Sequence, residues 1–223
     1  MCATQTTAAP PAPTAPGVGA ADAYQLEGCE RVCLLPRLAL SELIHVAGLV
    51  RAVRERAPDV MLLAPRAHVA AARALFADLD VRFQFVDAWD DAYAASAADG
   101  TSLLQRLERQ GYALVPLPSF RHACPYTLLG LPASAAAGLA VHRNEDAEAA
   151  LLQQVRDLAG GETFVVVHDD PVRRIRPDLV PEGVAAVHVR DPRLRTPNPL
   201  DWISVLDAAV QLHAIDSCFL VLA

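Results

Sequence analysis

Several features that would assign a chain to a class at once are missing from this sequence. It has no apolar run of about 18 residues, the length that a membrane-spanning helix needs, so we expect no membrane span. It also lacks an excess of positive charge, because its formal net charge is −7 and its pI is near 5.4. Nucleic acid and anionic membrane surfaces select basic proteins. We therefore expect no nucleic-acid partner.

Closely spaced pairs of cysteines are missing as well. The five cysteines are scattered without a CxxC pair: Cys2, Cys29, Cys33, Cys124 and Cys218. An odd and irregular set of this kind is typical of reduced thiols and not of a disulfide framework or a zinc site. The sequence therefore predicts a cytoplasmic protein without a metal site.

The beginning of the chain lacks any periodic apolar pattern. Residues 1–26 are rich in Ala, Pro and Thr, and no basic region followed by an apolar stretch marks them as a secretory signal. Such a segment cannot bury enough surface to offset the entropy lost on ordering. We predict a disordered tail over 1–26.

From Arg31 onward, short apolar runs alternate with stretches of helical periodicity. Strands are predicted over 31–36, 59–64, 81–88 and 112–117, and helices over 41–57, 67–79 and 103–110. Strands that alternate with helices in this way imply right-handed crossovers and a parallel sheet with helices on both of its faces.

A second set of alternating elements follows a helix that begins at Glu145 or Asp146 and is ended by Gly160 and Gly161. It consists of predicted strands over 163–167 and 183–192, a helix over 200–213, a short strand running into Asp216, and a helix from Cys218. The sequence therefore predicts an α/β protein of two Rossmann-like parallel-sheet domains, one over 27–145 and one over 146–223.

Glycine is missing from the loop that follows the first predicted strand. This loop, residues 36–42, reads Pro-Arg-Leu-Ala-Leu-Ser-Glu. A dinucleotide fingerprint needs glycines there so that the backbone can approach a pyrophosphate. We therefore do not expect a nicotinamide or flavin site.

Polar residues follow the strands of the second domain. His168 and Asp169 come after the strand over 163–167, Arg190 leaves the next strand, and Asp216 and Ser217 precede the last helix. Because the carboxyl ends of parallel strands share one edge of a sheet, we expect His168, Arg190 and Asp216 to converge. A helix start also favours an anionic ligand, although Asp216 or Ser217 could simply cap that helix.

Basic residues lie between these strand ends. Arg173 and Arg174 carry guanidinium groups, which suit the bidentate capture of phosphate, although a run of charges is also typical of a solvated loop. A metal is disfavoured, because successive His, Asp and Asp residues from His168 point in alternating directions along an extended chain.

The order of these segments resembles a known family. The second half of the chain looks like the nucleotide-binding half of bacterial glycosyltransferases of GT-B architecture. Four segments in order carry this resemblance: a strand with His-Asp-Asp and a basic loop, a strand with His-Val-Arg-Asp-Pro, an Asn-Pro-Leu-Asp-Trp helix and a His-Ala-Ile-Asp-Ser-Cys-Phe segment. The broad neighbourhood is that of the heptosyltransferases. The helix over 43–53 and its flanking strands resemble the first half of the same proteins.

The resemblance implies a transferase that moves a sugar from a nucleotide-sugar donor to an unknown acceptor, without a cofactor or a metal. Asp216 and Ser217 match the Asp-Ser or Asp-Thr that borders the sugar-nucleotide site in the family. The expected donor-binding residues are His168, Asp169, Arg173, Arg174, Arg190, Asp216 and Ser217. The first domain would receive the acceptor.

The chain departs from the family in two places. Relatives carry a Gly-rich loop with an Asp, and often a His, where the acceptor and the catalytic base are expected. Glu42 or His45 could substitute for them, but Ser41 and Glu42 equally fit a helix N-cap and a first-turn acid. The alternative is a catalytically degenerate module that serves binding or assembly.

The second departure is length, because the sequence stops at Ala223, about one turn into the helix from Cys218. We expect the second domain to be incomplete relative to the family. Its apolar end should then dock on the domain or on a second chain, with self-association through this C-terminus.

Overall fold

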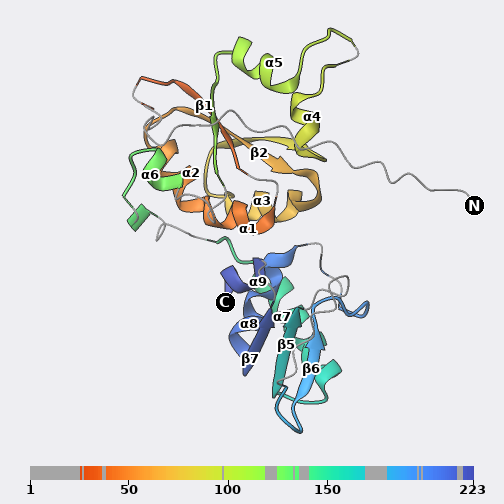
Figure 1. Cartoon of the computed structure of the whole chain (residues 1–223). Coiled ribbons are helices and arrows are strands. Elements are labelled where there is room, and N and C mark those ends of the chain that lie inside the picture. Colours follow the sequence, from red (N-terminus) through yellow and green to blue (C-terminus); the bar gives the residue numbers. More distant parts are fainter. Residues whose placement is uncertain are drawn as a thin grey trace, which may run out of the picture.

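The structure is a computed structural model that describes residues 26, 28–36, 39–96, 98–118, 125–132, 134–135, 141–168, 180–194, 196, 198–214 and 218–223. These residues form two α/β units, each built on a parallel sheet (Figure 1). The first unit has a sheet of four strands and the second a sheet of three. The expected α/β class with two parallel sheets is confirmed.

The sheet of the first unit has the strand order β3-β2-β1-β4. Its strands are β1 (Arg31–Leu35), β2 (Asp59–Pro65), β3 (Val81–Val86) and β4 (Ala113–Pro116). All neighbouring strands are parallel, and Val32 of the central β1 lies opposite Val60 on one side and Ala113 on the other. β1 is buried almost completely, as its continuous apolar run predicts.

Helices cover both faces of this sheet. The first three helices pack on one face and the next two on the other: α1 (Leu40–His45), α2 (Ala47–Arg54) and α3 (Val69–Leu75), then α4 (Trp89–Tyr93) and α5 (Leu103–Arg109). A 3₁₀ turn over Arg66–His68 precedes α3, and α6 (Pro125–Leu128) lies beside α2 (Figure 1). Along β1, Leu34 faces the first layer and Cys33 the second, because side chains alternate in a strand.

The second unit begins with α7 (Glu145–Ala159). Asn144 caps this helix, since its side-chain oxygen accepts a hydrogen bond from the Ala147 amide, and Gly160 ends it at φ 72°. The sheet order is β6-β5-β7, with β5 (Phe164–His168), β6 (Ala185–His188) and β7 (Gln211–Ala214) all parallel. A 3₁₀ turn (Pro199–Trp202), α8 (Ile203–Ala208) and α9 (Cys218–Leu222) complete the unit.

The structure corrects two local predictions, and a third lies almost entirely outside the described residues. The helix expected over 41–57 starts at Leu40 behind Ala39 and is interrupted at Val46, so Ser41 does not cap it. The helix expected over 200–213 stops at Ala208, because Gln211–Ala214 pairs as a strand with β5. The tail predicted over 1–26 lies outside the described residues except for Leu26, which is buried in the first core.

A hydroxyl inserted into the helix explains the interruption at Val46. In a continuous helix the Leu49 amide would donate to the His45 carbonyl, four residues earlier. The Tyr126 hydroxyl takes that place: it accepts from the Leu49 amide at 3.1 Å and donates to the His45 carbonyl at 2.9 Å. Inserting a side chain into the hydrogen-bond ladder is a common cause of helix kinks.

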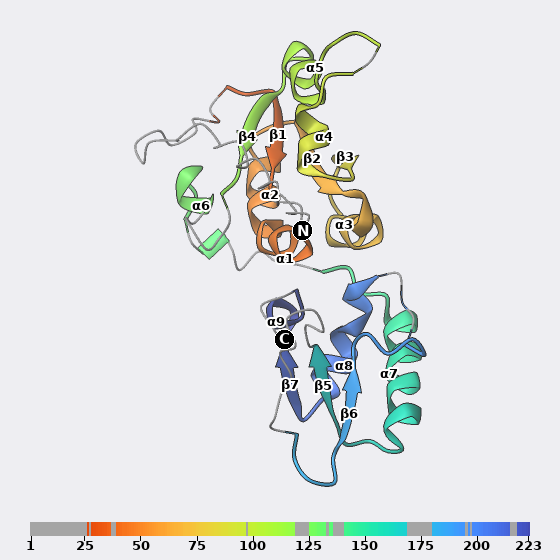
Figure 2. The same ribbon diagram turned by 45° about the vertical axis from the view of Figure 1, so that its right-hand side comes forward.

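The carboxyl ends of the two sheets face each other, as Figure 2 shows: β1 runs down toward the second unit, and β5, β6 and β7 run up toward the first. Helix α9 packs against α1 between the two edges. Cys218 and Leu222 of α9 touch the core of the first unit, and Phe219 is buried in the core of the second. The last helix therefore docks within the chain. Among the helices of the described ranges, none is long and apolar enough to cross a membrane.

Candidate functional site at the facing strand ends

Both sheets have a switch point at the edge that faces the other unit. In the first sheet the chain builds outward from β1 to β2 and β3, then returns to place β4 on the other side of β1. In the second sheet β6 and β7 lie on opposite sides of β5. Ligands of open α/β sheets bind outside the carboxyl ends of the strands at such points. The candidate site therefore lies at the ends of β1 and β4 and of β5 and β7.

His168 is the last residue of β5 and is half-buried. Its ring lies 4.8 Å from the Phe219 ring, centroid to centroid, with the planes at 54°. Phe219 in turn meets the Trp202 ring edge-on at 5.7 Å. Phe219 thus joins the end of β5 to the start of α9.

Arg190 follows β6 and is exposed. The backbone before it is tied to the end of β5, since the Val189 amide donates to the Val167 carbonyl at 2.9 Å. The neighbouring Asp191 carboxylate accepts hydrogen bonds from the Arg193 guanidinium and therefore does not pair with Arg190. These hydrogen bonds lower the pKa of Asp191 to about 2. Arg190 itself has no ion pair within the part of the chain that the structure describes. Its guanidinium is therefore available to an anionic ligand.

The other expected donor-binding residues, Asp169, Arg173, Arg174, Asp216 and Ser217, lie outside the described residues. The strands that lead to them are adjacent and parallel in the order β6-β5-β7. Their carboxyl ends therefore share one edge, as the sequence predicted. The convergence of the side chains stays a prediction.

Glu42 and His45, the candidate bases, both lie on α1, the helix that follows β1 and packs against α9. Glu42 is in the first turn and His45 in the last, and each side chain is half-buried. The helix is positioned from both ends, by the Leu40 and Leu43 contacts with the first core and by the Tyr126 hydroxyl at His45. Both residues therefore lie on the element between the two sheet edges.

A buried carboxylate that the sequence did not single out lies just beyond the segment joining the units. The Glu148 side chain is 1% exposed and accepts hydrogen bonds from Arg143 and from the amide and hydroxyl of Ser204. Burial alone would raise the pKa of Glu148, but these hydrogen bonds and the Arg143 charge outweigh it and lower the pKa. In the sequence, Glu148 could be noticed only as an acidic residue in the first turn of a helix. Its partner Ser204 lies 56 residues away, so no local pattern indicates that the carboxylate is buried and hydrogen-bonded.

The residue before Arg143 contacts the first unit. His142 Nε2 lies 3.7 Å from Asp78 Oδ1, and Asp78 is also paired with Arg51 of α2. The hydrogen bond from Arg51 is the chief cause that lowers the pKa of Asp78. Within the segment that joins the units, His142 therefore contacts the first unit and Arg143, the next residue, contacts the second.

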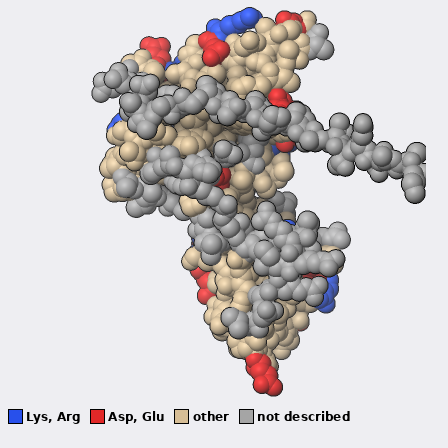
Figure 3. Space-filling model, viewed as in Figure 1, with Lys and Arg blue, Asp and Glu red and all other residues tan. Residues whose placement is uncertain are grey.

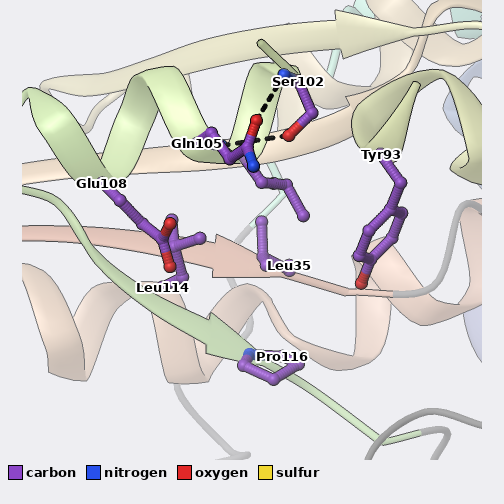
Figure 4. Close-up of a pocket in the computed structure, with 8 residues that line it drawn as sticks. Leu35, Tyr93, Ser102, Gln105, Glu108, Leu114 and Pro116 are labelled. Carbon is purple, nitrogen blue, oxygen red and sulfur yellow. Dashed lines mark hydrogen bonds between the residues drawn. The ribbon is translucent and has the colours of Figure 1, made fainter. Parts of the chain in front are cut away.

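A hollow of about 380 Å³ opens beside the first switch point, on the face covered by α4 and α5 (Figure 4). Leu35 and Pro116, the last residues of β1 and β4, form part of its lining. The rest comes from Leu114 of β4, from Tyr93 of α4, and from α5 with its cap: Ser102, Leu104, Gln105 and Glu108. The sequence prediction missed this hollow. The reversal of strand order is the signal that could have located it, but a strand order cannot be read from local periodicity.

On the face drawn in Figure 3, the acidic and basic side chains of described residues are scattered and form no single large patch. Within the described ranges, no group of three or more His, Cys, Asp or Glu side chains could hold a metal ion.

Comparisons with family models, with curated proteins and with solved structures give no match for this chain. The resemblance to glycosyltransferases therefore rests on the short segments quoted above.

Proposed function

We propose that the protein is a glycosyltransferase that takes a sugar from a nucleotide-sugar donor. The observation that carries the proposal is the orientation of the two parallel sheets, whose carboxyl edges face each other with α1 and α9 between them. Because ligands bind at the carboxyl edge of such sheets, this orientation would let one unit hold a donor and the other an acceptor at facing edges, beside α1 and α9.

The donor is assigned to the second unit. Its diphosphate would meet the guanidinium of Arg190, which has no ion pair among the described residues, with Arg173, Arg174 and Ser217 as further proposed partners. Arginine suits this task because its planar fork binds phosphate oxygens in pairs. His168 at the end of β5, and Asp169, the next residue in the sequence, would contact the remainder of the donor.

The reaction that follows is a displacement at the anomeric carbon. The bond from that carbon to the diphosphate oxygen breaks, a bond to an acceptor hydroxyl oxygen forms, and the hydroxyl proton moves to a base. Glu42 or His45 on α1 is the proposed base. Stabilising the departing diphosphate by arginines and backbone amides is the main catalytic demand, and it requires no metal in this proposal.

Turnover of isotope-labelled nucleotide sugars tests the proposal, and the parent protein should release nucleoside diphosphate from one donor of a panel. Arg190→Ala should weaken nucleoside diphosphate binding about ten-fold or more while leaving nucleoside binding unchanged, since a charge-assisted bond to phosphate is lost. Arg109→Ala is the matched control, because Arg109 is equally exposed but lies on α5. Equal affinity for nucleoside and diphosphate in the parent protein would contradict the proposal.

A binding or assembly module without turnover is the second candidate. The observation that favours it is the contact of α9 with α1, which places two helices between the facing edges where reactants would meet. The loop before α1 also lacks glycine. Tight binding of a nucleotide sugar without release of diphosphate, with every acceptor class tried, would support this candidate over the transferase.

A further inference from the structure

The hollow beside β1 and β4 is lined by both apolar side chains and polar groups. We propose that it binds a small ligand that has an apolar body and a protonated amine. The inference does not rest on the proposed transfer of sugar, although the hollow borders the ends of β1 and β4, because its lining on the α4 and α5 side carries the argument and no described residue of the second unit lines it.

Apolar side chains provide contact area for the body of the ligand. Leu35 and Leu104 are buried and Leu114 is half-buried, while Pro116 contributes a rigid ring at the end of β4. The volume of about 380 Å³ falls in the range of about 300–1,000 Å³ that is usual for ligand pockets. An aromatic ring with a short chain fits such a space.

Polar groups stand around these apolar residues. Figure 4 shows Tyr93 on one side and Glu108 on the other, with Ser102 and Gln105 between them on the helix above. The Gln105 carbonyl oxygen is used by the Ser102 amide at 2.9 Å, so its NH₂ group is the part left for a ligand. Neither the Tyr93 hydroxyl nor the Glu108 carboxylate bonds to another residue within the described ranges.

Charge decides the class of ligand. Among the described lining residues, Glu108 is the only carboxylate and none is a cation, so this lining carries one negative charge. The nearest cations on the same helix do not neutralise it: Arg106 donates to the Thr101 carbonyl at 3.0 Å, and Arg109, the next residue in the chain, projects from a different side of the helix. A carboxylate without a partner favours an ammonium group and disfavours an anion.

Three probes of the same shape test the proposal: 2-phenylethylamine, 2-phenylethanol and 3-phenylpropanoate, each titrated at pH 7 and low salt with amide chemical shifts as the readout. We expect binding on the order of millimolar, with the amine about two- to five-fold tighter than the alcohol, as an exposed ion pair allows, and with the carboxylate weakest. The shifts should centre on Gln105, Glu108 and Leu114.

Two variants and a control complete the experiment. Glu108→Gln keeps the shape of the side chain and removes its charge, so the amine should bind no more tightly than the alcohol, whose affinity should stay the same. Leu114→Phe narrows the hollow and should lower the affinity of all three probes. Glu55→Gln changes another exposed glutamate, beyond α2 on the opposite face, and should change nothing. Equal binding of amine and carboxylate, an unchanged preference in Glu108→Gln, or shifts centred elsewhere would overturn the proposal. Loss of sugar transfer would not bear on it.

Discussion

The guanidinium of Arg143 donates hydrogen bonds to both carboxylate oxygens of Glu148, with Nε 3.0 Å from Oε1 and 3.0 Å from Oε2. Arg143 belongs to the segment that enters the second unit, and Glu148 lies in the first turn of α7. The same carboxylate accepts from the Ser204 hydroxyl at 2.7 Å, on α8. One buried acid therefore fixes how the chain enters the second unit and how α7 and α8 pack.

Removing Arg143 should destabilise the protein strongly. In Arg143→Ala the Glu148 carboxylate, which is 1% exposed, loses its counter-charge. Because the Arg143 side chain is 41% exposed, the loss should be smaller than for a fully buried pair, and we expect about 2–3 kcal/mol. Urea unfolding at pH 7 measures the change. Arg66→Ala is the control, because its pair with Asp87 is exposed on both sides and should contribute at most about 1 kcal/mol. Similar losses in the two variants would show that the buried pair contributes little.

The same carboxylate predicts a pH dependence. The pKa of Glu148 is lower in the folded protein than its ordinary value of 4.5, because the hydrogen bonds from Arg143 and Ser204 outweigh its burial. A depressed folded pKa contributes stability above the unfolded pKa, and that contribution is lost as the pH falls from 4.5 through the folded pKa. The free energy of unfolding of the parent should therefore approach that of Glu148→Gln as the pH is lowered from neutral to below 4.5. A difference that stays constant over this range would contradict the pKa direction.

Tyr126→Phe should destabilise the protein at the interrupted helix. The variant removes the hydroxyl that bridges the Leu49 amide and the His45 carbonyl, and it leaves two backbone groups without that partner. We expect a loss of about 1–3 kcal/mol in thermal or urea unfolding. Tyr93→Phe is the matched control, since Tyr93 is 55% exposed. If Tyr126→Phe leaves the free energy of unfolding unchanged, the Leu49 amide has formed a direct hydrogen bond to the His45 carbonyl. A crystal structure of the variant would then show one continuous helix through Val46.

Gly48 is packed too tightly to accept a methyl group. A Cβ at this position would lie 2.2 Å from the Ala135 carbonyl oxygen and 3.0 Å from the Tyr126 hydroxyl. Gly48→Ala should therefore cost about 1–3 kcal/mol of unfolding free energy through overpacking, although alanine usually favours a helix. Gly161→Ala provides the control, because nothing lies within 4 Å of the added atom. A gain in stability for Gly48→Ala would mean that residues around Ala135 move aside freely.

Asp59 joins three strands at the edge of the first sheet that lies away from the second unit. Arg31 Nε donates to it at 2.9 Å, Arg82 Nε donates at 2.9 Å, and the Tyr112 hydroxyl lies 3.1 Å away. The Arg31 guanidinium also sits 4.4 Å above the Tyr112 ring. In Asp59→Ala two cations lose their shared anion, so we expect a loss of about 2–3 kcal/mol in urea unfolding. Asp80→Ala, at a side chain 91% exposed, should be nearly neutral.

Features that depend on neighbouring residues were predictable from the sequence. The Val-rich run before His168 became the central strand of the second sheet, and α7 begins at Glu145 and is ended by Gly160 in a left-handed conformation, as predicted. The alternation of strands and helices was enough to predict two parallel sheets, and hence one edge for His168 and Arg190. These results follow from spacing and backbone preference, which act within a few residues of the chain.

Other features were decided only when distant segments met. Gln211–Ala214 shows a helical pattern in sequence but pairs with β5, and Val46 interrupts a helical pattern because Tyr126, about eighty residues later, inserts its hydroxyl. The hollow at Glu108 exists because β4 returns to the far side of β1. Periodicity determines which side chains turn inward along one element, whereas strand order, inserted hydroxyls and buried acid partners depend on packing between elements. No local pattern records that packing, so only the tertiary structure could decide it.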